Sequence, residues 1–65
     1  MLTKQQTDAA RILLEERPPV IPGTNVIPNN QERNDWYLKV NRTMWQLKVA
    51  DSDRTEFCDV AGVAN

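Results

Sequence analysis

The sequence predicts a small α+β protein with an N-terminal helix, an extended proline-rich arm and an antiparallel β-hairpin or meander. Three observations support this fold class. Residues 1–17 have the start and stop signals of a helix, residues 18–35 contain all four prolines, and residues 36–65 begin with a repeated five-residue motif. The alternative is an all-α protein in which the same arm joins two or three short helices.

The N-terminal helix is predicted to begin at Thr3 and to stop at Arg17. Thr3 and Gln6 have the spacing of a capping box, in which each side chain accepts a hydrogen bond from the other residue's backbone N–H. Arg17 precedes Pro18, and a residue before proline is disfavoured in the helical region. Between these signals lies a dense apolar patch, formed by Ala9, Ala10, Ile12, Leu13 and Leu14.

The second predicted segment, residues 18–35, is an irregular arm. The motif Val-Ile-Pro occurs twice in it, at 20–22 and at 26–28, with Pro-Gly after the first copy. Pro-Gly indicates a turn, and Val-Ile-Pro is extended because proline restricts its own φ and the conformation of its predecessor. Disordered segments contain few β-branched residues, so we expect the arm to pack on its own domain or on a partner.

The third segment is predicted to form the hairpin because Trp-x-Leu-Lys-Val occurs at 36–40 and again at 45–49. On a helix, nine residues rotate the second copy by about 900°, to the side opposite the first. In a hairpin that turns at Arg42-Thr43, the apolar residues of both copies share one face. This arrangement places Trp36 and Trp45 on the same side of a two-stranded ribbon.

A helical interpretation of the third segment stays open. Arg-Thr matches poorly the Asn-Gly type of turn that two-residue hairpins prefer. A helix would also keep one apolar stripe, formed by Trp36, Val40, Met44 and Leu47. After the turn that residues 51–53 indicate, residues 54–60 add a third strand to the hairpin. In the helical interpretation, Asp53 and Glu56 instead cap a short helix that buries Phe57, Val60 and Ala61.

The composition argues against an enzyme. The chain has no histidine, and its one cysteine, Cys58, therefore lacks the base that usually activates a thiol nucleophile. Zinc sites need several cysteine or histidine ligands, and Asp51, Asp53 and Asp59 lack the glycine and glutamate of a calcium-binding loop. We predict no catalytic residue, no cofactor and no metal ion, and we expect Cys58 to be dispensable for activity.

The charge and hydropathy patterns restrict the location and the class of partner. Eight basic and nine acidic residues give a net charge of −1, which argues against nucleic-acid binding by bulk electrostatics and against attraction to anionic membranes. No apolar run approaches the length of a membrane span or of a signal-peptide core. A single free cysteine is typical of a reducing compartment. We therefore expect a cytoplasmic protein, or a virion protein assembled in the cytoplasm.

A partner is expected because a 65-residue chain without a disulfide has a small core. We predict a non-enzymatic structural or assembly subunit that docks onto a larger protein or a homo- or hetero-oligomeric assembly, such as a minor phage virion component. A small regulator or inhibitor of one target protein is the alternative, and a nucleic-acid-binding accessory protein is a second. The predicted partner-binding residues are Val20, Ile21, Val26, Ile27, Tyr37 and Lys39.

Overall fold

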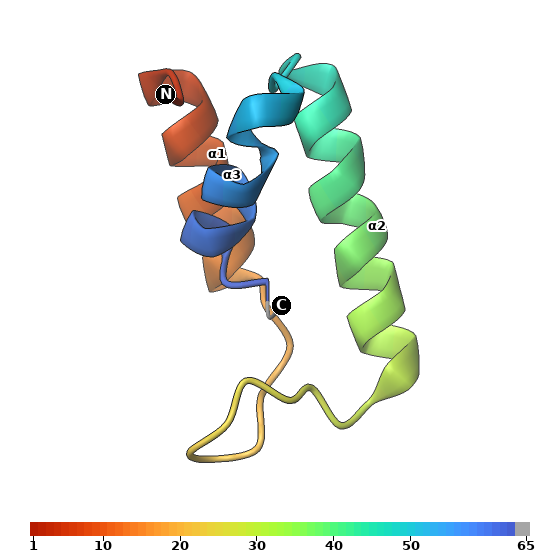
Figure 1. The fold of residues 1–65 in the computed structure, drawn as a ribbon. Coiled ribbons are helices and arrows are strands. Elements are labelled where there is room, and N and C mark those ends of the chain that lie inside the picture. The colour runs from red at the N-terminus through yellow and green to blue at the C-terminus, as the bar shows by residue number, and fades with distance from the viewer. Residues whose placement is uncertain (64–65) are drawn as a thin grey trace.

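The computed structural model describes residues 1–63, and none of these residues lies in a β-strand. Figure 1 shows the order of elements: α1 (Lys4–Glu15), α2 (Asn30–Gln46), the 3-10 turn η1 (Asp51–Asp53) and α3 (Arg54–Ala61). The α+β prediction is therefore wrong, and the all-α alternative fits. The long segment between α1 and α2 is the proline-rich arm, which is shorter than predicted because α2 already begins at Asn30.

Helix α1 begins as the capping box predicts. The Thr3 hydroxyl accepts a hydrogen bond from the Gln6 N–H at 3.1 Å, and Gln6 Oε1 accepts one from the Thr3 N–H at 3.0 Å. The helix ends at Glu15, slightly before the predicted stop. Ala10 and Leu13 of its apolar patch enter the core, whereas Ile12 stays exposed. One helical face cannot hold the whole patch, because its members surround more than half of the helix.

Helix α2 overturns the hairpin prediction. It contains the whole first Trp-x-Leu-Lys-Val copy and the first two residues of the second, Trp45 and Gln46. The Asn29 side chain caps its start by accepting a hydrogen bond from the Glu32 N–H at 3.0 Å. Trp36 is 5% exposed and Trp45 is 77% exposed, so the two indoles point to opposite sides of the helix. The predicted ribbon with both tryptophans on one side is wrong. Burial of the helical stripe Trp36, Val40 and Met44 decides the outcome.

The chain reverses after α2 through a Schellman motif. The Val49 N–H bonds to the Met44 carbonyl at 3.0 Å, and the Lys48 N–H bonds to the Trp45 carbonyl at 3.2 Å. Lys48 has a φ of 54°, at a position that glycine usually occupies in this motif. Val49 then enters the core, and the chain continues into η1.

Helix α3 forms where the helical alternative expected a short helix, but without the expected cap. Phe57 and Ala61 are fully buried, as that alternative expected, whereas Val60 is only half-buried. Asp53 makes no capping hydrogen bond with its side chain, so the expected cap does not form. The helix ends at Ala61, and Gly62 follows as its C-cap. The φ of Gly62 is 84°, a conformation that is strained for any residue with a Cβ.

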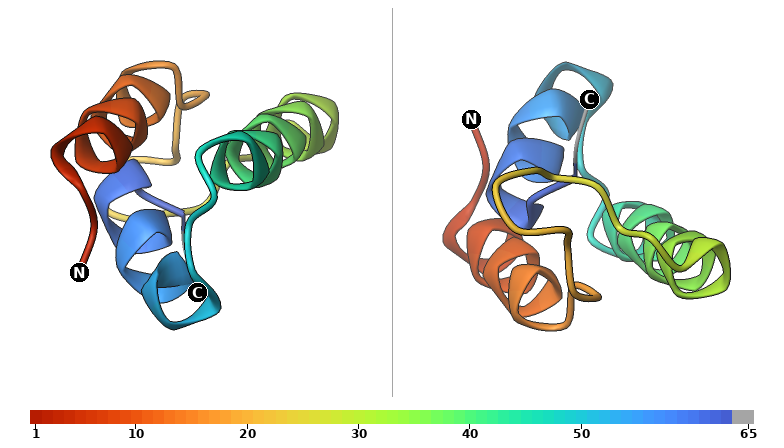
Figure 2. Two further views of the ribbon diagram at one scale, coloured as in Figure 1. Left: turned by 90° about the horizontal axis from the view of Figure 1, so that it is seen from above. Right: turned by 90° about the horizontal axis from the view of Figure 1, so that it is seen from below.

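The three helices enclose one core. Helices α1 and α3 lie side by side, and α2 stands across from them, as Figure 2 shows along the helix axes. The arm passes over the open end between α1 and α2 and contributes Ile27 to the interior. The buried apolar residues are Ala10, Leu13, Ile27, Trp36, Val40, Met44, Val49, Phe57 and Ala61.

Side-chain N–H groups from other parts of the chain bond to a carbonyl at the C-terminal end of each helix. The last four carbonyls of a helix have no partner within the helix, so these bonds supply one and also fix how the helices pack. They are Trp36 Nε1 to the Leu13 carbonyl at 2.9 Å, Gln6 Nε2 to the Leu47 carbonyl at 3.0 Å, and Arg17 Nη1 to the Gly62 carbonyl at 3.0 Å.

The contrast between the two tryptophans gives a stability prediction. Trp36→Phe keeps an aromatic ring in the core but leaves the buried Leu13 carbonyl without its donor, so we expect a loss of about 1–3 kcal/mol in the free energy of unfolding. Trp45→Phe changes an exposed side chain, and we expect a change within about 0.5 kcal/mol. Urea denaturation followed by circular dichroism measures both. Equal losses in the two variants would contradict the burial of Trp36 and the exposure of Trp45.

Candidate functional site

The arm, residues 18–29 in the structure, closes on itself. The Thr24 N–H bonds to the Ile21 carbonyl at 3.0 Å across Pro22-Gly23, and Gly23 has a φ of 80°. Proline followed by a left-handed glycine is the sequence of a type II turn. The Ile21 N–H then bonds to the Val26 carbonyl at 2.9 Å and closes the loop. The Pro-Gly turn that the sequence indicated is therefore present.

The two Val-Ile pairs of the arm divide between the core and the solvent. In the first pair Val20 packs against the core and Ile21 is exposed, and in the second pair Ile27 is 4% exposed while Val26 is 52% exposed. The arm is thus anchored to its own domain by one residue of each pair. Partner binding by these residues stays a prediction, but only Ile21 and Val26 offer substantial surface for it.

Tyr37 and Lys39 are two residues apart, so the predicted hairpin would place both on the face opposite its apolar residues. In α2 they lie on different sides of the helix. Tyr37 is half-buried, with its ring centroid 5.6 Å from that of Trp36. Lys39 is exposed on another side of the helix, where its ammonium group forms an ion pair with Glu16. The structure therefore does not unite the six predicted partner-binding residues in one surface.

The most exposed large apolar side chains of α2 were not among the predicted site residues. Leu38 is 61% exposed and Trp45 is 77% exposed. They are seven residues apart, so they lie on the same side of the helix, with exposed Arg42 between them. We call Leu38, Arg42 and Trp45 the outer face of α2, because it is opposite the buried stripe. Seven-residue spacing in the sequence is the signal that would have revealed this face once residues 36–46 were treated as a helix.

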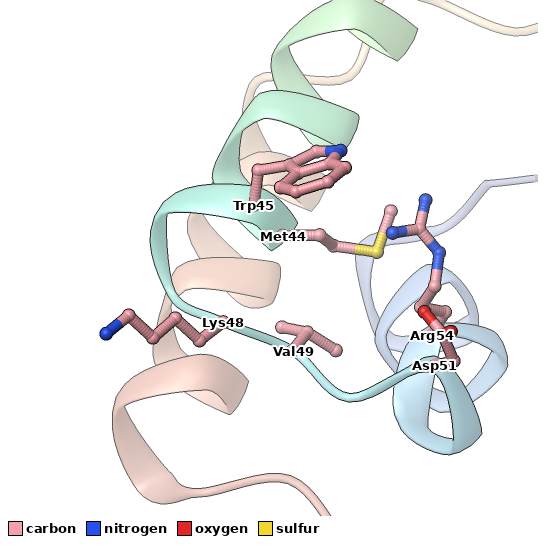
Figure 3. Close-up of a pocket in the computed structure, with 6 residues that line it drawn as sticks. All are labelled: Met44, Trp45, Lys48, Val49, Asp51 and Arg54. Atoms are coloured by element: carbon pink, nitrogen blue, oxygen red, sulfur yellow. The ribbon is translucent and has the colours of Figure 1, made fainter.

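A hollow of about 260 Å³ lies at the C-terminal end of this outer face (Figure 3). Buried Met44 and Val49 supply apolar surface to it, and the Trp45 indole lies at its edge. The Arg54 side chain extends from the start of α3 towards Met44 and Trp45, whereas the Lys48 side chain points away from them. We call this the α2-end hollow; its lining residues are Met44, Trp45, Lys48, Val49, Asp51 and Arg54.

A wider, shallower depression lies beside exposed Ile12 on α1 and has a volume of about 490 Å³. Its charged lining residues are Lys4 and Asp8, so it has both signs of charge. Arg11 lies 4.0 Å from Asp8 and balances that carboxylate further. This depression therefore has no charge preference that would indicate a class of ligand.

Cys58 is half-buried on α3 and packs against the core. Burial raises the pKa of its thiol above the ordinary value, although Arg54 has a smaller opposing effect. A raised pKa reduces the thiolate fraction at neutral pH, and the thiolate is the reactive form. The environment of Cys58 thus disfavours the thiolate form at neutral pH.

Comparisons with protein-family models, curated proteins and solved structures find no match for this chain. Within residues 1–63, no group of three or more histidine, cysteine or carboxylate side chains is arranged to hold a metal ion. No helix in the same part of the chain has the length and apolar character needed to cross a membrane. A functional assignment therefore depends on the surfaces described above.

The division of the arm predicts unequal effects for its neighbouring residues. Ile27→Ala removes buried methyl groups, and we expect a loss of about 2–5 kcal/mol, enough to unfold much of so small a domain. Ile27→Val is the milder variant and should cost about 0.5–1.5 kcal/mol. Val26→Ala is the matched control and should cost less than Ile27→Val because Val26 is exposed. Thermal melting followed by circular dichroism checks the order, and a larger effect for Val26→Ala would contradict it.

The raised pKa of Cys58 predicts slow alkylation. At pH 8, the folded chain should react with iodoacetamide more slowly than the same chain in denaturant, because burial keeps the thiol protonated and covered. The rate of the folded chain should rise with pH and reach its plateau at a higher pH than the rate of the unfolded chain. Mass spectrometry of timed samples measures both rates. Equal rates at pH 8 would show that the Cys58 thiol is not buried and that its pKa is not raised.

Proposed function

We propose that this chain is a non-enzymatic structural or assembly subunit that docks onto a larger protein through the outer face of α2. The observation that carries the proposal is the exposure of Leu38 and Trp45 on one side of that helix. Trp45 also lines the α2-end hollow, where Met44 and Val49 continue the apolar surface towards the core. Scattered exposed apolar residues are ordinary in proteins, but a tryptophan beside an apolar hollow is a combination that favours binding.

The energetics of folding do not account for Trp45. Its side chain is 77% exposed and makes no hydrogen bond to any other residue within 1–63, whereas Trp36 on the same helix is buried and hydrogen-bonded. Burying a large apolar side chain stabilises a complex by about 1.5–3 kcal/mol, so a partner that covers Trp45 gains substantially. Tryptophan is also among the residue types most enriched at binding hot spots. Exposed Leu38, two turns away, extends the contact along the helix, as in complexes that use one helical face.

The chemistry of the chain supports a role in binding rather than in catalysis. The sequence contains no histidine, and the pKa of its one thiol is raised in the direction that suppresses its nucleophilic form. Side-chain hydrogen bonds to backbone carbonyls join α1 to α2 and the end of α1 to the end of α3, which gives a rigid support for the outer face. A rigid surface loses little entropy when it docks, and this favours binding.

Site-specific photo-cross-linking in the cells that produce the protein tests the proposal. A benzoylphenylalanine at position 38 should form a discrete adduct with a second protein, because that position lies within the docking face. Trp45→Ala in the same chain should lower the adduct yield by about ten- to a hundredfold at limiting partner, which corresponds to about 1.4–2.8 kcal/mol of binding free energy.

The matched control places the same photo-reactive group at exposed position 56 on α3, outside the proposed face. We expect little adduct there. Circular dichroism of Trp45→Ala should remain that of the parent chain, since Trp45 does not support the fold. A yield at position 38 no greater than at position 56 would overturn the proposed function.

A further inference from the structure

Resting on the proposed docking function, we propose that the partner segment bound at the α2-end hollow is acidic and inserts one large apolar side chain. The lining of the hollow combines apolar side chains, among them Met44 and Val49, with charged ones.

The hollow is suited to a single apolar side chain. Met44 and Val49 are both buried core residues, so the surface they present to the hollow is apolar and rigid. The Trp45 indole extends this surface outward at the edge (Figure 3). A volume of about 260 Å³ has room for one large side chain and not for a whole helix. A partner residue that enters would cover part of the indole.

The charges around the hollow favour carboxylates on the partner. Arg54 and, one turn before Trp45, Arg42 supply two cations near the hollow, and Lys48 supplies a third that points away from it. Asp51 is the single lining carboxylate. Arg54 Nη2 donates to Asn41 Oδ1 at 3.4 Å, which directs the guanidinium across the hollow and leaves most of its five N–H donors free. Arginine binds carboxylates through paired hydrogen bonds, and such bonds are stronger than neutral ones.

Lys48 follows the C-terminal end of α2 and has a left-handed φ of 54° at a position where glycine is the usual residue. Its side chain is exposed and points to the far side of the helix end, where it makes no ion pair among the described residues (Figure 3). A cation at this end interacts favourably with the helix dipole. An acidic segment that runs past the helix end would pair with it as well.

Single-stranded nucleic acid is the competing class, because it also uses exposed aromatic rings beside cations. The chain as a whole has a net charge of −1, and three cations are few for a nucleic-acid footprint. An apolar hollow beside the aromatic ring also suits an aliphatic side chain better than a planar base. The observations favour an acidic protein segment.

Three matched synthetic helical peptides test the inference on the full chain. Each has a central leucine, flanked by glutamate in the first peptide, glutamine in the second and lysine in the third. In titrations followed by NMR, the glutamate peptide should shift the Trp45 indole signal and bind at least about tenfold more tightly than the glutamine peptide. Replacing its leucine by alanine should also weaken binding, and added salt should weaken only the glutamate peptide.

Variants of the chain identify the cations. Lys48→Gln and Arg54→Gln should each weaken the glutamate peptide several-fold and should leave the glutamine peptide unchanged. Lys4→Gln removes the same charge from exposed α1 and should leave both unchanged. Equal binding of the three peptides, binding of none, or tight binding of oligo-dT in their place would overturn the inference. The same Trp45 shift on raising the concentration of the chain alone would overturn it too, since a second copy would then be the occupant.

The cross-linking experiment separates this inference from the proposed function. If the adduct formed at position 38 maps to an acidic partner segment with an apolar residue, and Lys48→Gln lowers its yield, the docking function and the acidic partner are both supported. If it maps to a neutral or basic segment, docking stands and the acidic partner is overturned. If position 38 gives no adduct above the control, the docking function itself fails.

Discussion

The hydrogen bond from the Trp36 indole to the Leu13 carbonyl is the contact on which the rest of the structure depends. It joins α2 to the end of α1 within the core, where an unpaired carbonyl would be costly. It also fixes which side of α2 faces inward. Because helical geometry rotates Trp45 to the opposite side, burial of Trp36 directly causes the exposure of Trp45. The core and the proposed docking face are therefore two consequences of one contact.

The remaining links show how so short a chain holds together without a disulfide. Gln6 both caps α1 and bonds to the carbonyl at the end of α2, and Arg17 bonds to the end of α3. The arm adds Ile27 to the core, so a segment with no regular structure is part of the fold. Each link satisfies a backbone group that would otherwise lack a partner, which is why few residues suffice.

The proposed docking surface joins features that folding leaves unused. Trp45 and Leu38 face solvent, and Lys48 keeps a left-handed conformation that suits glycine better. Arg54 is directed across the α2-end hollow by its bond to Asn41. An acidic segment with one apolar residue would satisfy all of these groups at once, because it would cover the indole and pair with the cations.

The sequence by itself determined the features that depend on neighbours along the chain: the Thr3–Gln6 capping box, the Pro-Gly turn and the apolar stripe through Trp36. For the tryptophan repeat it wrongly favoured a hairpin over the helix that forms, since alternation and helical spacing both fit a few apolar residues. Nor could it tell which residue of each Val-Ile pair is buried, or that Leu38 and Trp45 form a surface. Tertiary packing decided these points, because burial depends on which partner supplies the other wall of the core.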